Sequence, residues 1–309
     1  MHYLNHGFNA MTSKSTAPFN IAPELVILDT LPDNLRKRFK VALKLMHENL
    51  FDSLSWEMVA KKSAISPFHF HRQFSELFQE TPGRYLSRVR LQHAVHLLLT
   101  EPQKRVTDIA HLCGYSSSQV LAKVLKRELG VSANELRPAG SNSTPLQTFK
   151  HLEKLAHPRH GDSFEKHLAK SMPAELVWYA KRGVKVIEVP DFDWDKAYSQ
   201  FGDKSLQLLT LTPIGDIDRC WDEIAMMIAD WNAPIQDQNE SVAEGYYLCC
   251  EVFVLNDTGY VTAIESLFER ARGLGFKVDT SKALVEMMLS PHCDEDGGAS
   301  FSFQLPVQS

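Results

Sequence analysis

The residues best suited to recognition chemistry lie on one face of a helix predicted from Pro67 to about Phe78. Phe70 and Phe74 recur at helical spacing and predict its buried face. An arginine can bind guanine through two hydrogen bonds, a histidine can donate or accept at a base edge, and an aromatic ring can pack on a thymine methyl group. All three side chains occur on the opposite, outward face, whose members are Phe68, His71, Arg72 and Ser75.

A second helix, predicted from Ser118 to Leu129, repeats this design. Leu121 and Leu125 predict its buried face, and glutamine and lysine on the other side suit adenine and guanine or phosphate, respectively. The outward residues are Ser118, Gln119, Ala122 and Lys123. Together, the outward faces of the two helices predict a protein that binds double-stranded DNA.

The elements that must position these faces form an all-α region over residues 31–138. A short helix, a tight turn and a capped helix occur at 56–78 and again at 108–129, and a helix over 83–99 joins the two helix-turn-helix units. Ser66-Pro67 and Thr81-Pro82 are typical helix starts, with a capping hydroxyl before a proline. A stiff connecting helix can hold two recognition helices about one DNA turn, roughly 34 Å, apart.

Charge is distributed unevenly along the chain. Over residues 31–140, Lys and Arg number 17 against 10 Asp and Glu, whereas over 141–309 they number 15 against 26. A basic half joined to an acidic half is expected of a nucleic-acid binder with an attached module of different purpose.

The linked motifs of the basic half resemble the AraC/XylS family of transcription regulators. They are Ser66-Pro-Phe-His-Phe-His-Arg-Gln-Phe74, Glu80-Thr-Pro-Gly-Arg-Tyr-Leu86, Arg90-Leu-Gln-His-Ala94, Ile109-Ala-His-Leu-Cys-Gly-Tyr-Ser-Ser-Ser118 and Lys126-Arg-Glu-Leu-Gly130 through Glu135-Leu-Arg137. The resemblance covers about residues 33–138. It implies a transcription regulator, expected to act as an activator, in which the outward residues named above contact bases. The chain departs from the family at Gln79, where glycine is usual, so the first recognition helix is expected to end differently.

The remaining residues divide into three predicted parts. They are a mostly flexible tail over 1–30, in which Met11 is an alternative start, a linker over 139–170 that is helical only in part after residue 147, and an α+β domain over 171–309. Strands are predicted near 176–180, 184–189, 206–212, 246–255, 284–288 and 301–307, and helices over 220–231 and 261–273. We expect a sheet with helices on one face.

The α+β half resembles GyrI-like effector-binding domains, in the Rob-like arrangement known within the family above. The resemblance rests on Val285-Glu-Met-Met288 and Phe303-Gln-Leu-Pro-Val307. It implies an apolar pocket in which one buried carboxylate pairs with a cationic or amphipathic effector. The predicted effector-binding residues are Glu286, Glu251, Trp178, Tyr179, Trp221, Tyr246 and Phe253. Core packing is the plainer interpretation of each aromatic residue.

Other chemistry is not predicted. His93 and His96 can share a helix face, but the sequence offers no third ligand nearby for a metal site. Cys249 and Cys250 point to opposite faces of a predicted strand, which argues against a zinc site. Cys293 is followed by Asp-Glu-Asp, whose negative charge disfavours a nucleophilic thiolate. We therefore expect no metal, no cofactor and no enzymatic activity. A small-molecule hydrolase and a protein-interaction module remain alternatives for the second half. We expect a cytoplasmic protein that binds promoter DNA and not membranes, with RNA polymerase as a further partner.

Overall fold

The computed structural model describes residues 17–51, 55–190, 192–291 and 297–308. These residues divide into two compact units. The helical unit comprises Ile21–Ala169 and Asn256–Thr262, and the sheet unit comprises the described residues up to Asn20, Lys170–Leu255 and Ala263 onward. The alternative start at Met11 and the thiol of Cys293 lie outside the described residues.

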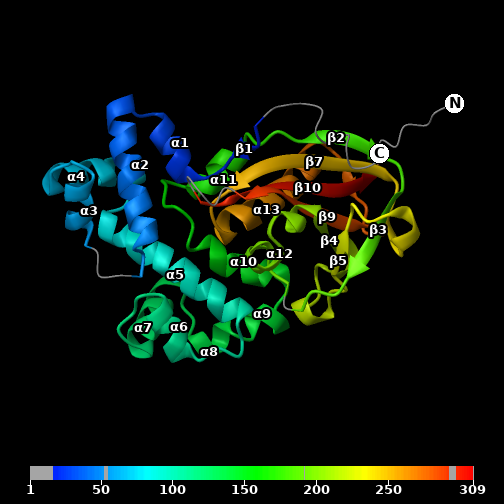
Figure 1. The fold of residues 1–309 in the computed structure, drawn as a ribbon, viewed down its shortest axis with the longest axis horizontal. Helices are drawn as coiled ribbons and strands as arrows, with labels where there is room; N and C mark the ends of the chain where they lie inside the picture. The colour runs from blue at the N-terminus through cyan, green and yellow to red at the C-terminus, as the bar shows by residue number, and fades with distance from the viewer. Residues whose placement is uncertain (1–16, 52–54, 191, 292–296, 309) are drawn as a thin grey trace. The chain divides into compact units, whose positions relative to one another are not determined.

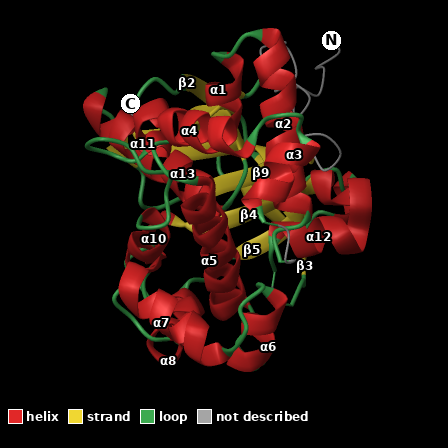
Figure 2. Ribbon diagram, turned by 90° about the vertical axis from the view of Figure 1, so that its left-hand side faces the viewer, coloured by secondary structure: helices red, strands yellow, loops and turns green. Residues whose placement is uncertain are grey.

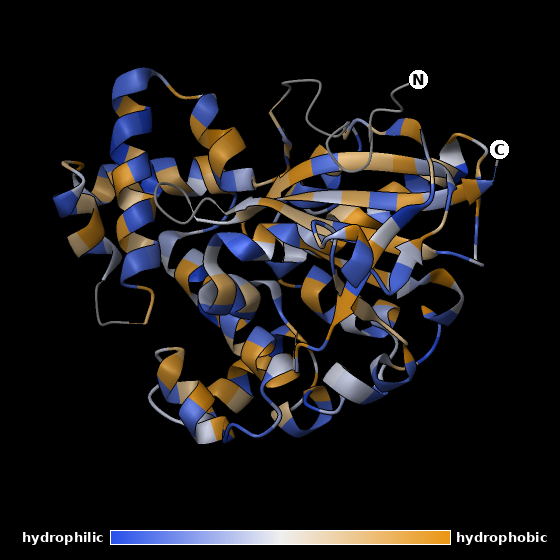
Figure 3. Cartoon of the chain, turned by 45° about the vertical axis from the view of Figure 1, so that its right-hand side comes forward, coloured by the Kyte–Doolittle hydropathy of each residue, from blue (hydrophilic) through white to orange (hydrophobic). Residues whose placement is uncertain are grey.

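The helical unit is built on capped amphipathic helices. In chain order they are α1 (Pro23–Asp29), α2 (Asp33–Glu48), α3 (Trp56–Lys62), α4 (Pro67–Phe78), α5 (Pro82–Thr100), α6 (Val106–Leu112), α7 (Ser118–Glu128), α8 (Ala133–Leu136), α9 (Ala139–Asn142), α10 (Pro145–Glu153) and α11 (Phe164–Ala169). Figure 2 shows α5 as the long element that joins α1–α4 to α6–α8. In Figure 3 the helices alternate between hydrophilic and hydrophobic residues, as amphipathic helices do.

Two hydrophobic cores lie along α5. Tyr85 and Leu86, from its first turns, belong to the core formed with α1–α4. Leu91, Val95 and Leu98, further along, belong to the core formed with α6–α8. One continuous helix therefore supplies side chains to both cores and connects the pair α3–α4 to the pair α6–α7.

Two predictions for the helical unit are wrong. Residues 17–30 are not wholly a flexible tail, because they contain α1 with Ile27 and Leu28 buried. The predicted linker over 139–170 contains α9, α10 and α11. Thr144 caps α10 and forms a reciprocal capping box with Gln147, and Leu152 is buried, so this segment is an ordered part of the unit.

The sheet unit is a ten-stranded, mainly antiparallel sheet (Figure 1). Its strands are β1 (Phe19–Asn20), β2 (Glu175–Tyr179), β3 (Arg182–Ile187), β4 (Leu208–Pro213), β5 (Met227–Asp230), β6 (Glu240–Val242), β7 (Gly245–Val254), β8 (Lys277–Val278), β9 (Ala283–Pro291) and β10 (Ala299–Gln308). The main path runs β1-β7-β10-β9-β4-β5-β3-β6. Two residues join β2, which pairs with β7, to β3, which pairs with β5, so the sheet must curve strongly.

Helices α12 (Trp194–Phe201) and α13 (Asp257–Gly273) accompany this sheet. The ring of Trp194 packs edge-on against Phe301 of β10, with centroids 5.8 Å apart. Leu267 and Ala271 of α13 are buried. The predicted helix over 220–231 is wrong, because a short 3-10 turn at Trp221–Glu223 is followed by strand β5, which pairs with both β3 and β4.

Candidate nucleic-acid interface

The first candidate recognition helix, α4, has its two faces fixed by a cap and an aromatic core. The backbone N–H of His69 donates to the Ser66 hydroxyl at 3.4 Å, and Pro67 occupies the first turn. Phe70, Phe74 and Phe78 are fully buried and stack with Phe39 of α2 at centroid distances of 5.6, 6.4 and 6.5 Å. With this face locked inward, the opposite face must be turned outward.

The predicted contact residues of α4 lie on or beside that outward face. Phe68 is 78% exposed, which is unusual for a large apolar side chain without a partner, and Arg72 is exposed. His71 is half-buried, with its ring 5.1 Å from that of Trp56 on α3. Ser75 is also half-buried and donates its hydroxyl proton to the His71 carbonyl at 2.8 Å, so only its lone pairs remain available to a base.

The second candidate helix, α7, follows the same plan with an aliphatic core. The Ser117 hydroxyl accepts from the backbone N–H of Val120 at 3.3 Å, and Leu121 and Leu125 are fully buried. The outward residues are the exposed Gln119, Ala122 and Lys123 and the half-buried Ser118. The structure thus groups the four predicted side chains of each helix on one side of it.

Helix α5 sets the scale of the arrangement. Its 19 residues correspond to a length of roughly 28 Å at 1.5 Å per residue. That length is comparable to the roughly 34 Å between successive major-groove faces of a duplex.

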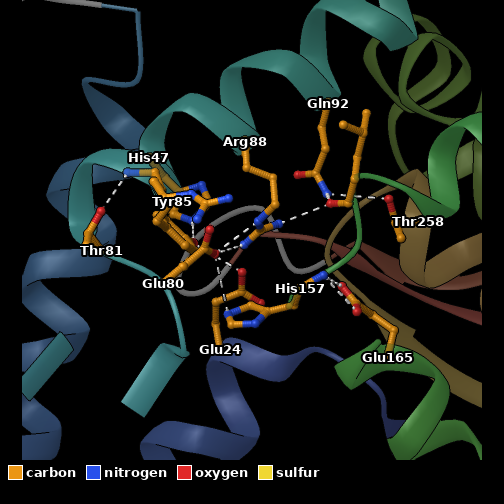
Figure 4. A network of polar contacts seen from close by, with 12 residues as sticks. Glu24, His47, Glu80, Thr81, Tyr85, Arg88, Gln92, His157, Glu165 and Thr258 are labelled. Carbon is orange, nitrogen blue, oxygen red and sulfur yellow. Dashed lines mark hydrogen bonds and ion pairs between the residues drawn. The ribbon is translucent and has the colours of Figure 1, made fainter. Parts of the chain in front are cut away.

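A buried polar network, which the sequence did not predict, surrounds the first half of α5 (Figure 4). Arg88 donates from Nε and Nη2 to Glu80 Oε1 at 3.0 and 2.7 Å. Tyr85 donates its hydroxyl proton to Glu24 at 3.1 Å, and because this phenol has one proton, His47 Nε2, 2.8 Å away, must be the donor of that contact. The members come from separate segments of the chain, so spacing within the sequence could not reveal them. An arginine at an inward position of α5 was the available signal.

Two groups of this network have pKa values far from their ordinary ones. Burial raises the pKa of Glu165 to about 7. Burial, followed by the nearby charge of Arg88, lowers the pKa of His157 to about 4. The backbone N–H of His157 donates to both carboxylate oxygens of Glu165 at 3.0 Å.

The predicted effector-binding residues do not converge on one site. By strand alternation and register, Glu286, Trp178 and Tyr246 share one face of the sheet, with Tyr246 and Trp178 directly paired. Tyr179, Glu251 and Phe253 lie on the other face, while Trp221 belongs to a 3-10 turn. A single pocket formed by all seven is therefore wrong.

The environments on the two faces also differ. Glu286 is 8% exposed and accepts a hydrogen bond from the Thr212 hydroxyl at 3.3 Å. On the other face Tyr179 lies under the buried guanidinium of Arg182, 4.1 Å from its ring centroid. The exposed fractions of Trp178 and Tyr246 are 54% and 38%, so these rings lie at the surface.

The remaining candidates of the sequence are accounted for by local contacts. His96 Nδ1 lies 2.8 Å from Asp257 Oδ2, and the ring of His93 stacks on His96. Burial raises the pKa of Cys249 to about 12 and that of Cys250 still further. No group of three or more His, Cys, Asp or Glu side chains within the described ranges could hold a metal ion. None of the helices in that part of the chain has both the length and the apolar character to span a bilayer.

Comparisons with known proteins bear on the helical unit. Residues 59–139 match the family model described as a helix-turn-helix domain. The transcriptional activator RhaS of Escherichia coli is 34% identical over 105 residues, which are 34% of this chain and 37% of RhaS. The chain thus matches little more than a third of the length of this relative.

Two solved structures each cover about a third of this chain. An AraC-type transcriptional regulator from Chromobacterium violaceum is 23% identical and covers 35% of this chain and 96% of its own, with a TM-score of 0.32. The DNA-binding domain of AdpA, solved with a target DNA, is 28% identical and covers 32% of this chain and 87% of its own, with a TM-score of 0.30. The family model lies within residues 33–138 apart from its last residue, the part of the chain that carries the sequence motifs.

Proposed function

We propose, from the premise that residues 59–139 are an AraC-type helix-turn-helix domain, that this chain is a sequence-specific DNA-binding transcription regulator. The observation that carries the proposal is the repeated design of α4 and α7. Each helix buries one face completely and presents polar or exposed side chains on the other, and both are attached to the single helix α5.

Each recognition helix receives a defined role. On α4, Arg72 would bind guanine, His71 a base edge and Phe68 a thymine methyl group or sugar. On α7, Gln119 would bind adenine and Lys123 guanine or phosphate, with Ser118 and Ala122 in contact with the same groove. Lys and Arg contacts to phosphates would supply affinity without sequence preference.

The test begins with selection of bound sequences from random duplexes. Two conserved half-sites about one turn apart are expected, and their absence contradicts the proposal. Arg72→Ala should weaken binding to the selected site by about 1–3 kcal/mol and relax the preference at one base pair. Arg84→Ala removes another exposed positive charge, at the start of α5, and serves as the matched control. It should lower affinity similarly for all sequences and leave the base preference unchanged.

The named relative is an activator, and we extend this to the present chain: bound at a promoter, it would favour transcription, with RNA polymerase as the partner contacted. A promoter fusion carrying the selected site measures the direction of regulation. Lower expression in the presence of the protein would overturn activation while leaving DNA recognition intact.

For the sheet unit we propose effector sensing centred on Glu286. The support is a buried carboxylate that accepts from Thr212 and stands opposite Thr210 and Phe303 in the sheet register, because a charge in such surroundings gains from a cationic partner. Cationic amphipathic compounds should raise the melting temperature of the full chain, and Glu286→Gln should abolish that shift. A shift that survives the substitution contradicts the assignment. Chemical conversion of the compound would support the alternative of a hydrolase.

A further inference from the structure

Residues 145–169, which we call the brace, begin beyond the segment that matches the helix-turn-helix domain. The brace consists of α10, a turn and α11. Leu152 and Leu155 are buried in the core formed with α6–α8, whereas Phe164 packs against the core formed with α1–α4. One short segment thus contacts both cores of the helical unit, as α5 does.

Directly after α10 the brace contacts the C-terminus of α7. Lys154 donates from Nζ to the carbonyl of Leu129 at 3.0 Å, and Leu129 is the residue that caps α7. The last carbonyls of a helix lack donors within the helix, so an ammonium group there both satisfies a carbonyl and opposes the negative end of the helix dipole.

Three residues further on, in the turn between α10 and α11, the brace contacts the C-terminus of α4. The ring of His157 is 1% exposed and lies 5.8 Å from that of Phe78, the last residue of α4. His157 Nε2 is also 3.9 Å from Glu80 Oε1, just past the end of the helix. Arg88 binds Glu80 and donates from Nη1 to the carbonyl of Leu155 at 3.3 Å, which ties α4, α5 and the brace together (Figure 4).

The brace is held together internally. Besides the hydrogen bonds between His157 and Glu165, Lys166 of α11 pairs with Glu153 of α10. Gln92 of α5 donates to the same Leu155 carbonyl as Arg88, at 2.8 Å. These contacts make the turn between α10 and α11 a cross-linked connection.

We infer that the brace is a positioning element that fixes the separation of α4 and α7 and therefore the spacing between DNA half-sites. A single helix such as α5 can bend along its length. A second connection that joins the C-terminal ends of both recognition helices closes the frame and opposes that bending. The inference rests on the proposed function, because it assigns a spacing to the two recognition helices.

The experiment compares three duplexes: the selected site, the same site with one base pair inserted between the half-sites, and a single half-site. One inserted base pair moves a half-site by about 3.4 Å and rotates it by about 35°. Lys154→Met removes the ammonium group but retains most of the side chain. Lys150→Met makes the same change at an exposed lysine within α10, one turn before Lys154, and is the matched control.

Lys154→Met should weaken binding to the selected site about three- to tenfold, the effect expected for the loss of one ordinary hydrogen bond. Its affinity for the single half-site and for the widened site should change little, so the penalty for the inserted base pair shrinks. Lys150→Met should retain the wild-type penalty. His157→Ala removes the contact at the α4 end and should act in the same direction. If it fails to fold, Lys154→Met alone decides the matter.

A wild-type spacing penalty in folded Lys154→Met protein overturns the inference but leaves the proposed function standing. Wild-type protein that binds no sequence specifically, or that tolerates any spacing, overturns both. Equal loss in Lys150→Met and Lys154→Met would show that charge alone matters, which also contradicts the brace.

Discussion

The two helix pairs, α3–α4 and α6–α7, share a backbone design but differ in their cores. Each pair has a seven-residue first helix, a turn with one residue in the left-handed region, and a serine-capped second helix. The turn bonds also correspond, since Ile65 N–H donates to Ala60 O at 3.0 Å and Tyr115 N–H to Ala110 O at 2.8 Å.

The difference lies in what fills and supports this backbone. The first pair has stacked phenylalanines and a network of buried charges beside them, whereas the second has leucines. The first turn uses Ala64 at φ 55° and the second Gly114 at φ 73°. The comparison teaches that turns and caps determine this motif, while the core residues are interchangeable within the apolar class.

The largest expected effect tests the aromatic core. Phe74→Ala should lower the free energy of unfolding by about 3–5 kcal/mol, because its ring contacts three other phenylalanine rings and Tyr85. Phe68→Ala on the same helix should change it by less than about 0.5 kcal/mol, since that ring is exposed. Chemical denaturation measures both. Similar losses in the two variants would contradict the assignment of the buried and outward faces.

The buried charges predict a pH dependence specific to the first pair. Glu165 has a folded pKa of about 7, above its unfolded value, so the folded state holds this proton longer. The proton on Glu165 therefore adds roughly 3 kcal/mol to the free energy of unfolding below about pH 4.5, and this contribution is lost as pH rises to about 7. Glu165→Gln should remove this loss.

His157 acts in the opposite direction. Its folded pKa of about 4 lies below the unfolded value, so stability falls as pH drops from about 6.5 to about 4. Denaturation at a series of pH values should show Glu165→Gln flattening the higher range and His157→Gln the lower one. Curves that match the wild type would contradict the placement of these groups in the core.

The second turn predicts a smaller loss. Gly114→Ala should destabilise the protein by about 2 kcal/mol. An alanine would have to adopt the left-handed backbone conformation of Gly114, and its Cβ would lie 3.0 Å from the Phe51 carbonyl oxygen. Gly130→Ala also changes a left-handed glycine but meets no atom within 4 Å, so it should cost less. Melting temperatures compare the two, and a larger cost at Gly130 would exclude the close approach as the cause.

The smallest effect is a gain at the equivalent position of the first turn. Ala64→Gly should stabilise the protein by about 0.5–1 kcal/mol, because the strain of a left-handed alanine costs more than the extra conformational entropy that glycine loses on folding. Destabilisation by Ala64→Gly would contradict the strain at this turn.

Gln79 adopts the same left-handed conformation, φ 55°, at the end of α4. The helix therefore ends as it would with a glycine at this position, and our expectation of a different ending is wrong.

Local sequence signals predicted the helical unit well where a single residue, such as a capping serine or threonine, determines where a helix begins. Ser66 and Thr81 cap helices as predicted, each by accepting a hydrogen bond from the backbone N–H three residues further on. The same signal at Thr144-Pro145 was outweighed by the surrounding small polar residues, which suggested a linker. Capping was the better guide there because it depends on specific hydrogen bonds, whereas composition only averages over many residues.

Non-local arrangements could not be predicted. Glu24, Glu80, Arg88, His157 and Glu165 meet through tertiary packing of separate segments. In the sheet unit, alternation gives the two faces of each strand but not which face of one strand adjoins which face of another. The effector set therefore mixed two faces, and the helical period over 220–231 concealed a strand whose pairing with β3 and β4 decides its conformation.

Gly140 shows how much can depend on the absence of a side chain. A Cβ at this residue of α9 would lie 2.2 Å from the carbonyl oxygen of Leu99, near the end of α5. Any other amino acid would push the chain away at the point where it leaves α8 and enters the brace. If the brace sets the half-site spacing as we propose, a substitution at this residue would change the tolerance for operator length and leave every proposed base-contacting residue in place.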